Sequence, residues 1–171
     1  MKDMKTCLVM TLLGPDRPGL VRSLSSAVAD HGGNWLESRM ARLAGHFAGI
    51  LRVECPEESV EPLIETLRSF AKDGLSVQAV RETTSERGGR KEWQIEVVGN
   101  DRPGIVRQLS AAITGSGGNV EELITGLESA AMSGHPIFRA RGVVSLPADA
   151  DENALVSAIE QLGPDLAVEI S

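Results

Sequence analysis

The sequence predicts an α+β protein of two similar units, each a four-stranded antiparallel sheet with two helices on one face. Three observations support this prediction: an internal repeat, alternating apolar residues where strands are expected, and apolar residues at helical spacing between them. The segment from Gly14 to Glu37 recurs 85 positions later without a gap, and 14 of its 24 residues are identical in the second copy. Such a repeat indicates a duplicated folding unit.

Each unit opens with a predicted strand followed by a helix. Trp93, Ile95 and Val97 alternate with polar residues, which is the two-residue period of a strand with one solvent-facing side. The repeat places a matching strand at residues 8–12. A pair of glycines ends the helix that follows, because glycine adopts the left-handed conformation at low cost. The apolar helix positions are Leu20, Leu24, Ala27 and Val28 in the first copy, and Ile105, Leu109, Ala112 and Ile113 in the second.

A hairpin, a second helix and a last strand complete each unit. Hairpin strands are predicted at 34–43 with 47–55, and at 119–127 with 137–146. The order strand, helix, strand, strand, helix, strand is that of a ferredoxin-like split βαβ unit. Apolar residues mark the second helix and last strand: Val60, Leu63, Ile64, Leu67 and Phe70 with Leu75, Val77 and Ala79, then Leu155, Ala158, Ile159 and Leu162 with Leu166, Val168 and Ile170.

These patterns divide the chain into a first domain at 1–83, a polar, glycine-containing linker at 84–90 and a second domain at 91–171. Each domain is small for an independent core, so we expect the halves to pack together with pseudo-twofold symmetry. Exposed sheet edges make a homodimer a candidate assembly. About six extra residues separate the second pair of hairpin strands, around Ser129 to His135. This loop is either a specialised contact or a tolerated surface insertion.

The composition narrows the function. No apolar run is long enough to span a membrane and no signal-peptide pattern is present, so we expect a cytoplasmic protein with no membrane partner. A net charge of -7 and 3% aromatic residues argue against direct nucleic-acid binding, which needs basic charge and, on sheets of this kind, exposed aromatic rings. Cys7 and Cys55 fall on opposite faces of the expected sheet, so we expect reduced thiols.

The segment whose residues can bind a ligand is the turn between the first strand and the first helix, residues 14–19. Asp16 is expected to cap the free N–H groups of the helix, Pro18 to begin its first turn, and Gly19 to let a ligand approach. The positive end of the helix dipole can hold a carboxylate, while Asp16 and Asn34 can accept hydrogen bonds from an ammonium group. The turn is therefore interpreted either as a site for a free amino acid or as a plain helix cap.

Neighbouring residues bear on that choice. Arg17 is kept as Arg102 in the second copy, and a helix cap has no need of an arginine, which favours the ligand site. The copies also differ, because Asn100 stands in place of Pro15 and Val120 in place of Trp35 in the second. Trp35 is expected to narrow the first site, so the two sites are expected to be unequal.

Two βαββαβ units, each with an Asp-Arg-Pro-Gly-(Leu/Ile)-Val turn and a Gly-Gly-Asn after the first helix, resemble tandem ACT domains. Within that family the chain is similar to the glycine cleavage system transcriptional repressor group, which also has a segment like Met132-Ser-Gly-His-Pro-Ile-Phe138. The resemblance implies a regulatory module that binds a small amino acid where two ACT units meet. It also implies glycine as the effector, a DNA-binding activator protein as the partner, and no cofactor.

The ligand positions implied by the resemblance are the first turn and the start of the second strand of each unit. In this chain they are Asp16, Arg17, Gly19, Leu20 and Asn34, and Asp101, Arg102, Gly104, Ile105 and Asn119.

An alternative from another class is a small enzyme, or a regulatory subunit of a metabolic enzyme, that uses the cleft between the units. The sequence suggests no catalytic residues: it has no evident Ser-His-Asp or Cys-His arrangement, phosphate-binding loop or dinucleotide fingerprint. His31, His46 and His135 lack the spacing of metal ligands, so no metal site is expected. We therefore favour the amino-acid sensor over the enzyme.

Overall fold

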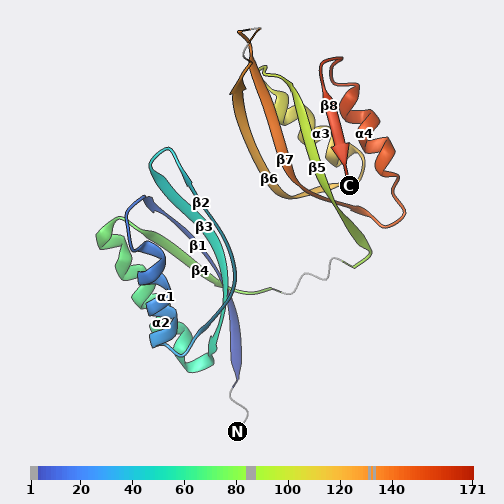
Figure 1. Cartoon of the computed structure of the whole chain (residues 1–171). Helices are drawn as coiled ribbons and strands as arrows, with labels where there is room; N and C mark the ends of the chain where they lie inside the picture. Colours follow the sequence, from blue (N-terminus) through green and yellow to red (C-terminus); the bar gives the residue numbers. More distant parts are fainter. Residues whose placement is uncertain (1–3, 84–87, 131, 133) are drawn as a thin grey trace. The chain divides into compact units, whose positions relative to one another are not determined.

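The computed structural model describes residues 4–83, 88–130, 132 and 134–171 (Figure 1). The chain divides into two compact units, Met1–Ser85 and Glu86–Ser171, and each is considered by itself. Within the expected linker at 84–90, residues 84–87 lie outside the described residues, and Arg90 is already the first residue of a strand.

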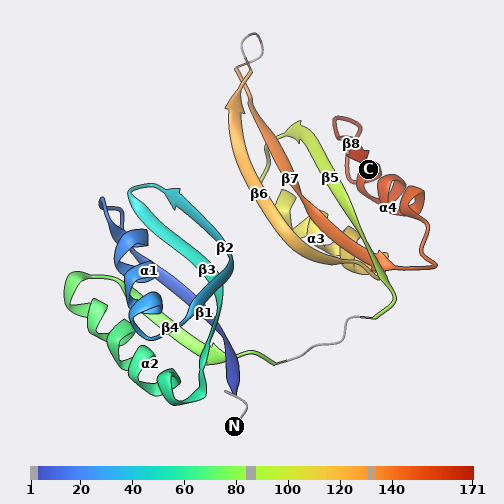
Figure 2. The same ribbon diagram turned by 60° about the horizontal axis from the view of Figure 1, so that its bottom comes forward.

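The first unit is one antiparallel sheet with the strand order β2-β3-β1-β4. Strand β1 pairs with β3 on one side and β4 on the other, which leaves β2 and β4 at the edges. The two helices cover the same face of this sheet (Figure 2). The elements are β1 (Lys5–Pro15), α1 (Leu20–Asp30), β2 (Asn34–Leu43), β3 (His46–Pro56), η1 (Glu57–Ser59), α2 (Val60–Ser69), η2 (Phe70–Asp73) and β4 (Ser76–Arg81).

The second unit repeats this topology with the strand order β6-β7-β5-β8. The predicted fold of two βαββαβ units is thereby confirmed. No helix in the described parts of the chain is long and apolar enough to cross a membrane. The elements are β5 (Arg90–Asn100), α3 (Ile105–Gly115), β6 (Asn119–Ser129), β7 (Pro136–Pro147), α4 (Glu152–Glu160) and β8 (Ala167–Ile170).

The core of each unit lies between its sheet and its two helices. Alternate residues of an inner strand point into it, so Leu8, Met10 and Leu12 of β1 are buried, as are Ile95 and Val97 of β5. Removing this apolar surface from water is the main stabilising contribution. The buried helical residues that meet the sheet are Leu20, Leu24, Ala27, Val28, Val60, Leu63 and Leu67 in the first unit, and Ile105, Leu109, Ile113, Leu155 and Ile159 in the second.

The paired glycines after the first helix of each unit have two separate roles. Gly32 and Gly117 adopt the left-handed conformation, with φ of 71° and 73°, as predicted. Gly33 is needed for space, because a Cβ there would lie 2.8 Å from Cγ1 of Val28. The glycine pair thus ends the helix and lets the chain pass close to it on the way into β2.

The two hairpins differ at their tips. Ala44 and Gly45 join β2 to β3 with φ of 48° and 79°, and two successive left-handed residues are typical of a tight two-residue hairpin. The second hairpin, between β6 and β7, is longer, and residues 131 and 133 in its loop lie outside the described residues. A contact role for the loop at 129–135 stays a prediction.

A cluster around Glu57 joins the first strand of the first unit, β1, to its last strand, β4. Its carboxylate accepts hydrogen bonds from Arg81 at 2.6 and 2.8 Å and another from the hydroxyl of Thr6. The Arg81 guanidinium, followed by the Thr6 hydroxyl, lowers the pKa of Glu57 from 4.5 to about 2. The ionised carboxylate is therefore the form that the folded state favours.

We expect Glu57→Gln to lower the thermal midpoint of the first unit at neutral pH and to have little effect near pH 2. Because the pKa of Glu57 is depressed on folding, its contribution is present above about pH 4.5 and is lost as the pH falls toward 2. Circular dichroism melts across this range would measure it, with the exposed neighbour substituted as Glu58→Gln for a control. A gap between wild type and Glu57→Gln that stays constant down to pH 2 would contradict the assignment.

Candidate functional site

The first turn of the first unit links the end of β1 at Pro15 to the start of α1 at Leu20. Gly19 precedes the helix in the left-handed conformation, with φ of 88°, and no side chain caps the helix start. The prediction that Asp16 caps the helix is therefore wrong, as is the placement of Pro18 in its first turn. A left-handed residue at the N-cap turns the chain away before Asp16 can reach the N–H groups. Those N–H groups remain without a side-chain acceptor, as an anion site requires.

Asp16 instead ties the turn to the tip of the first hairpin. Its carboxylate accepts an ion-paired hydrogen bond from Nε of Arg42, at 2.7 Å. Its backbone N–H donates to the carbonyl of Gly45 at 2.9 Å. Sequence reasoning missed Arg42, because nothing in its local pattern shows that β2 returns to the turn.

Arg17 and Arg102 have a structural role that the sequence did not indicate. Arg17 lies 4.0 Å from the carboxylate of Asp73, in the segment before β4. Arg102 lies 3.6 Å from the carboxylate of Asp165, before β8, and its guanidinium also donates to the carbonyl of Leu162 at 3.0 Å. Arg102 thus joins its turn to the segment before the last strand, which weakens the argument from its repetition. Arg17 only approaches the corresponding segment, because both partners of its 4.0 Å pair are exposed.

The second turn has the same backbone but a different electrostatic setting. Gly104 precedes α3 with φ of 85°, again with no side-chain cap, so Asp101 is not the expected cap either. The N–H of Asp101 donates to the carbonyl of Pro136 at 3.0 Å, which ties this turn to its own hairpin. Among the described residues, no cation pairs with the carboxylate of Asp101.

A shallow depression lies at each turn and gathers four of the five residues predicted for that unit. The first has a volume of about 400 Å³ and the second about 310 Å³. In both, an aspartate carboxylate and the start of a helix lie beside apolar side chains, an arrangement that can receive an ammonium and a carboxylate together. The first is lined by Asp16, Arg17, Gly19, Leu20, Val21, Arg22 and Phe47, and the second by Asp101, Arg102, Gly104, Ile105, Val106, Thr125, Gly126, Leu127 and Phe138.

Asn34 and Asn119 are not brought to the turns of their own units. Asn34 pairs with Glu54, near the end of β3, whereas the turn lies beside Phe47 and His46 at the beginning of that strand. The eleven-residue helix α1 separates the two positions by roughly 16 Å along its axis. Within either unit, therefore, one small amino acid cannot contact both the aspartate and the asparagine.

The prediction that Trp35 narrows the first turn is wrong for the same reason. Trp35 follows Asn34 at the start of β2, pairs with Val53 and packs against the first core. It therefore lies at the opposite end of α1 from Asp16. The structural difference that the two turns do show is the pairing of Arg42 with Asp16 in the first.

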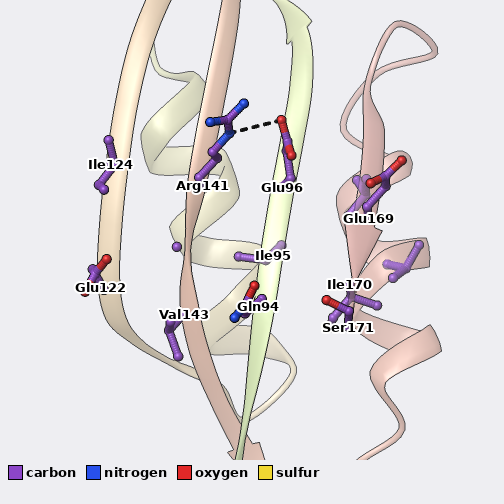
Figure 3. A pocket seen from close by; sticks show the side chains of 13 residues that line it. Gln94, Ile95, Glu96, Glu122, Ile124, Arg141, Val143, Glu169, Ile170 and Ser171 are labelled. Atoms are coloured by element: carbon purple, nitrogen blue, oxygen red, sulfur yellow. Dashed lines mark hydrogen bonds and ion pairs between the residues drawn. The ribbon is translucent and has the colours of Figure 1, made fainter.

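A larger depression, of about 770 Å³, lies over the second sheet and extends to β8 (Figure 3). Among its lining residues Arg141 on β7 donates to Glu96 on β5 at 3.2 Å, as the dashed line in Figure 3 shows. Arg139 also pairs with Glu96 and binds Glu128 at 2.8 Å. Arg139 and then Arg141 hold the pKa of Glu96 below its usual value. Both arginines are thus already paired with glutamates, while Glu122 and Glu169 also line the depression. The sequence had predicted only that the polar residues around Glu96 lie on the solvent-facing side of a strand.

The other reactive residues do not form a site. Cys55 is buried and Cys7 is partly exposed on the other face of the sheet, and both are free thiols. Burial raises the pKa of both thiols, which makes them poorer nucleophiles. In the part of the chain that the structure covers, no group of three His, Cys, Asp or Glu residues is placed to hold a metal ion.

The comparisons with known proteins agree with this architecture. The profile of the family described as ACT domain matches residues 6–79, almost the whole first unit. The first unit is therefore similar to ACT domains. Because the second unit repeats its strand order and its turn, the chain as a whole is a tandem ACT-like protein.

Two curated relatives point to one group within that class. The chain is 26% identical over 164 residues to the glycine cleavage system transcriptional repressor of Escherichia coli (strain K12), which covers 93% of this chain and 85% of the relative. It is equally similar to the protein of the same name from Shigella flexneri. The similarity thus extends through both units.

Solved structures share the complete fold. A protein of unknown function from Galdieria sulphuraria matches 98% of both chains with a TM-score of 0.86 and 26% identity. The crystal structure of a candidate glycine cleavage system transcriptional repressor matches 98% of this chain and 97% of its own, with a TM-score of 0.70 and 16% identity. At 16% identity, the likeness to this second structure shows a shared fold alone.

Proposed function

We propose that this chain is a non-enzymatic regulatory protein of the cytoplasm that binds a small amino acid and acts on a partner transcription regulator of glycine cleavage. Glycine is the first candidate for the ligand, and a DNA-binding activator is the partner that the resemblance implies. The support for this proposal is the similarity to the glycine cleavage system transcriptional repressor over 93% of the chain. A metabolic enzyme as the partner is the alternative.

The observation on which the ligand part depends is the chemistry at the two turns. At each, an aspartate carboxylate lies beside a helix start whose N–H groups have no side-chain cap. The carboxylate suits the ammonium of an amino acid and the helix start suits its carboxylate. Apolar side chains such as Phe47 lie beside them at the first turn. The choice of glycine or serine as first candidates comes from the family resemblance and not from the size of these shallow depressions.

Asn34 and Asn119 enter this proposal in a restricted way. Each lies at the far end of the helix from the turn of its own unit. We therefore assign the carboxylate and ammonium contacts to the turns. An asparagine contributes only where another ACT unit brings it to a turn, as the family resemblance implies.

We expect glycine to bind the full chain with an affinity between micromolar and millimolar, about 4 to 8 kcal/mol. Isothermal titration calorimetry would measure it, followed by serine and then the other amino acids. The double variant Asp16→Asn with Asp101→Asn should lose binding, since the ammonium then has no anionic acceptor.

Glu58→Gln is the control, because Glu58 is exposed and distant in sequence from both turns. Circular dichroism would establish that each variant is folded. An absence of heat with every amino acid would remove the sensor function. Equal binding by the double variant would remove the turns as its site.

A further inference from the structure

The two turns differ at one position of the neighbouring hairpin. Arg42 on β2 lies opposite Phe47 of β3, and Leu127 on β6 lies opposite Phe138 of β7. These two pairs occupy the same place in their units, both in the repeat and in the strand register. The first unit thus has a cation where the second has a leucine.

This difference determines which charged partner each aspartate of the two turns has. In the first turn the guanidinium of Arg42 lies 2.7 Å from the carboxylate of Asp16, within charge-assisted hydrogen-bonding distance. That is the contact which the ammonium of an amino acid would make. In the second turn Leu127 carries no charge, and within the described part of the chain no other cation pairs with Asp101.

The arginine that is part of the second turn, Arg102, is already bound elsewhere. Arg102 donates to the side chain of Gln108 at 3.1 Å and to the carbonyl of Leu162 at 3.0 Å, and it lies 3.6 Å from Asp165. Three separate partners hold its guanidinium on the side of α3 and of the segment before β8. Arg102 therefore supplies no counter-ion to Asp101. Arg107 has its guanidinium 3.9 Å from where a Cβ on Gly104 would lie, but among the described residues it forms no ion pair with Asp101 either.

The two depressions also differ in the elements that line them. The second extends over β6, where Thr125, Gly126 and Leu127 line it. The first is lined by the turn, α1 and Phe47, and by no residue of β2. The unit without the arginine thus has the depression that continues along the hairpin.

We propose that Arg42 acts as an internal competitor for the ligand at the first turn, so that the second turn is the higher-affinity amino-acid site of this chain. The inference rests on the proposed function. It adds which of the two turns binds the amino acid more tightly and which residue causes that difference. Arg42 and Asp16 are exposed by 70% and 31%, so their ion pair is a surface pair of modest strength. Displacing it should cost the ligand roughly 2- to 5-fold in affinity.

A reciprocal exchange tests this proposal, with glycine as the probe in calorimetry of the full chain. Leu127→Arg copies the first unit into the second and should weaken the tighter site by roughly 2- to 5-fold. Arg42→Leu copies the second unit into the first and should strengthen the weaker site by a similar factor. Both positions are largely exposed, so neither change threatens the fold.

The single aspartate variants identify the two sites. Asp101→Asn should weaken the tighter site by at least about 10-fold, while Asp16→Asn should leave it unchanged. Leu43→Ala, on the neighbouring exposed position of β2, controls for substitution near the turn.

The outcomes separate this inference from the function on which it rests. Glycine binding that responds to Asp16→Asn but not to Asp101→Asn would overturn the inference and leave the sensor function intact. The same holds if Leu127→Arg and Arg42→Leu change neither affinity. An absence of heat in wild type with glycine, serine and all other amino acids would remove the sensor function itself, and this inference with it.

Discussion

Gly142→Ala is expected to destabilise the second unit by about 2 to 3 kcal/mol. A Cβ at Gly142 would lie 2.0 Å from the carbonyl oxygen of Glu122 and 3.2 Å from the Cα of Leu123. Both are backbone atoms, so no side-chain rotation relieves the clash. Gly142 pairs with Leu123, next to a register shift of β6 against β7 between Val120 and Glu122.

Gly126→Ala is the matched control for this substitution. Gly126 lies on the same pair of strands, and a Cβ there meets nothing within 4 Å. Its substitution should leave the second unit unchanged or slightly stabilise it, because alanine restricts the unfolded chain more than glycine does. Urea unfolding followed by Trp93, the tryptophan of the second unit, would measure both variants in a Trp35→Phe background. A loss below about 0.5 kcal/mol for Gly142→Ala would show that the bulge rearranges freely.

Leu63→Ala should destabilise the first unit by about 3 kcal/mol. Leu63 lies on α2, is 0% exposed and belongs to the core between the helices and the first sheet. Its removal loses apolar burial and leaves a cavity that a close-packed core fills only in part. Leu43→Ala on β2 is the control, because Leu43 is 80% exposed and should change the stability by less than about 0.5 kcal/mol.

Trp35 packs against the first core and reports its unfolding in a Trp93→Phe background. An unchanged Trp35 transition in Leu63→Ala would contradict the assignment of Leu63 to this core. The same variant in the Trp35→Phe background tests the expected packing of the two halves. If the two halves unfold as one body, the Trp93 transition shifts together with the Trp35 transition. If the halves are independent, the Trp93 transition is unchanged by Leu63→Ala.

Local pattern was enough to predict the elements of this fold. Alternation along residues 92–97 predicted a strand because a strand presents successive side chains to opposite faces, and β5 has that pattern of burial. The glycine pair at 32–33 predicted the end of α1 because its left-handed conformation is a property of the residue itself. Each of these inferences depends on neighbours within a few residues.

The site was predicted less well because its contacts join distant residues. The sequence placed Asp16 as a helix cap, but the left-handed Gly19 directs the chain away from the helix start, and Arg42 takes the carboxylate. It also grouped Asp16 with Asn34, although the full length of α1 lies between them. Neither result is visible in the order of residues along the turn.

The sequence by itself determined that this protein is a duplicated βαββαβ chain with an aspartate, an arginine and a glycine at each first turn. Only the tertiary structure decided what those residues contact: Arg102 joins its turn to the segment before β8, and Arg42 pairs with Asp16. Leu127 occupies the place of Arg42 in the second unit, and among the described residues no cation pairs with Asp101. The physical reason is one of range. Periodicity and glycine conformation act between near neighbours, whereas an ion pair depends on which strands the sheet brings beside the turn.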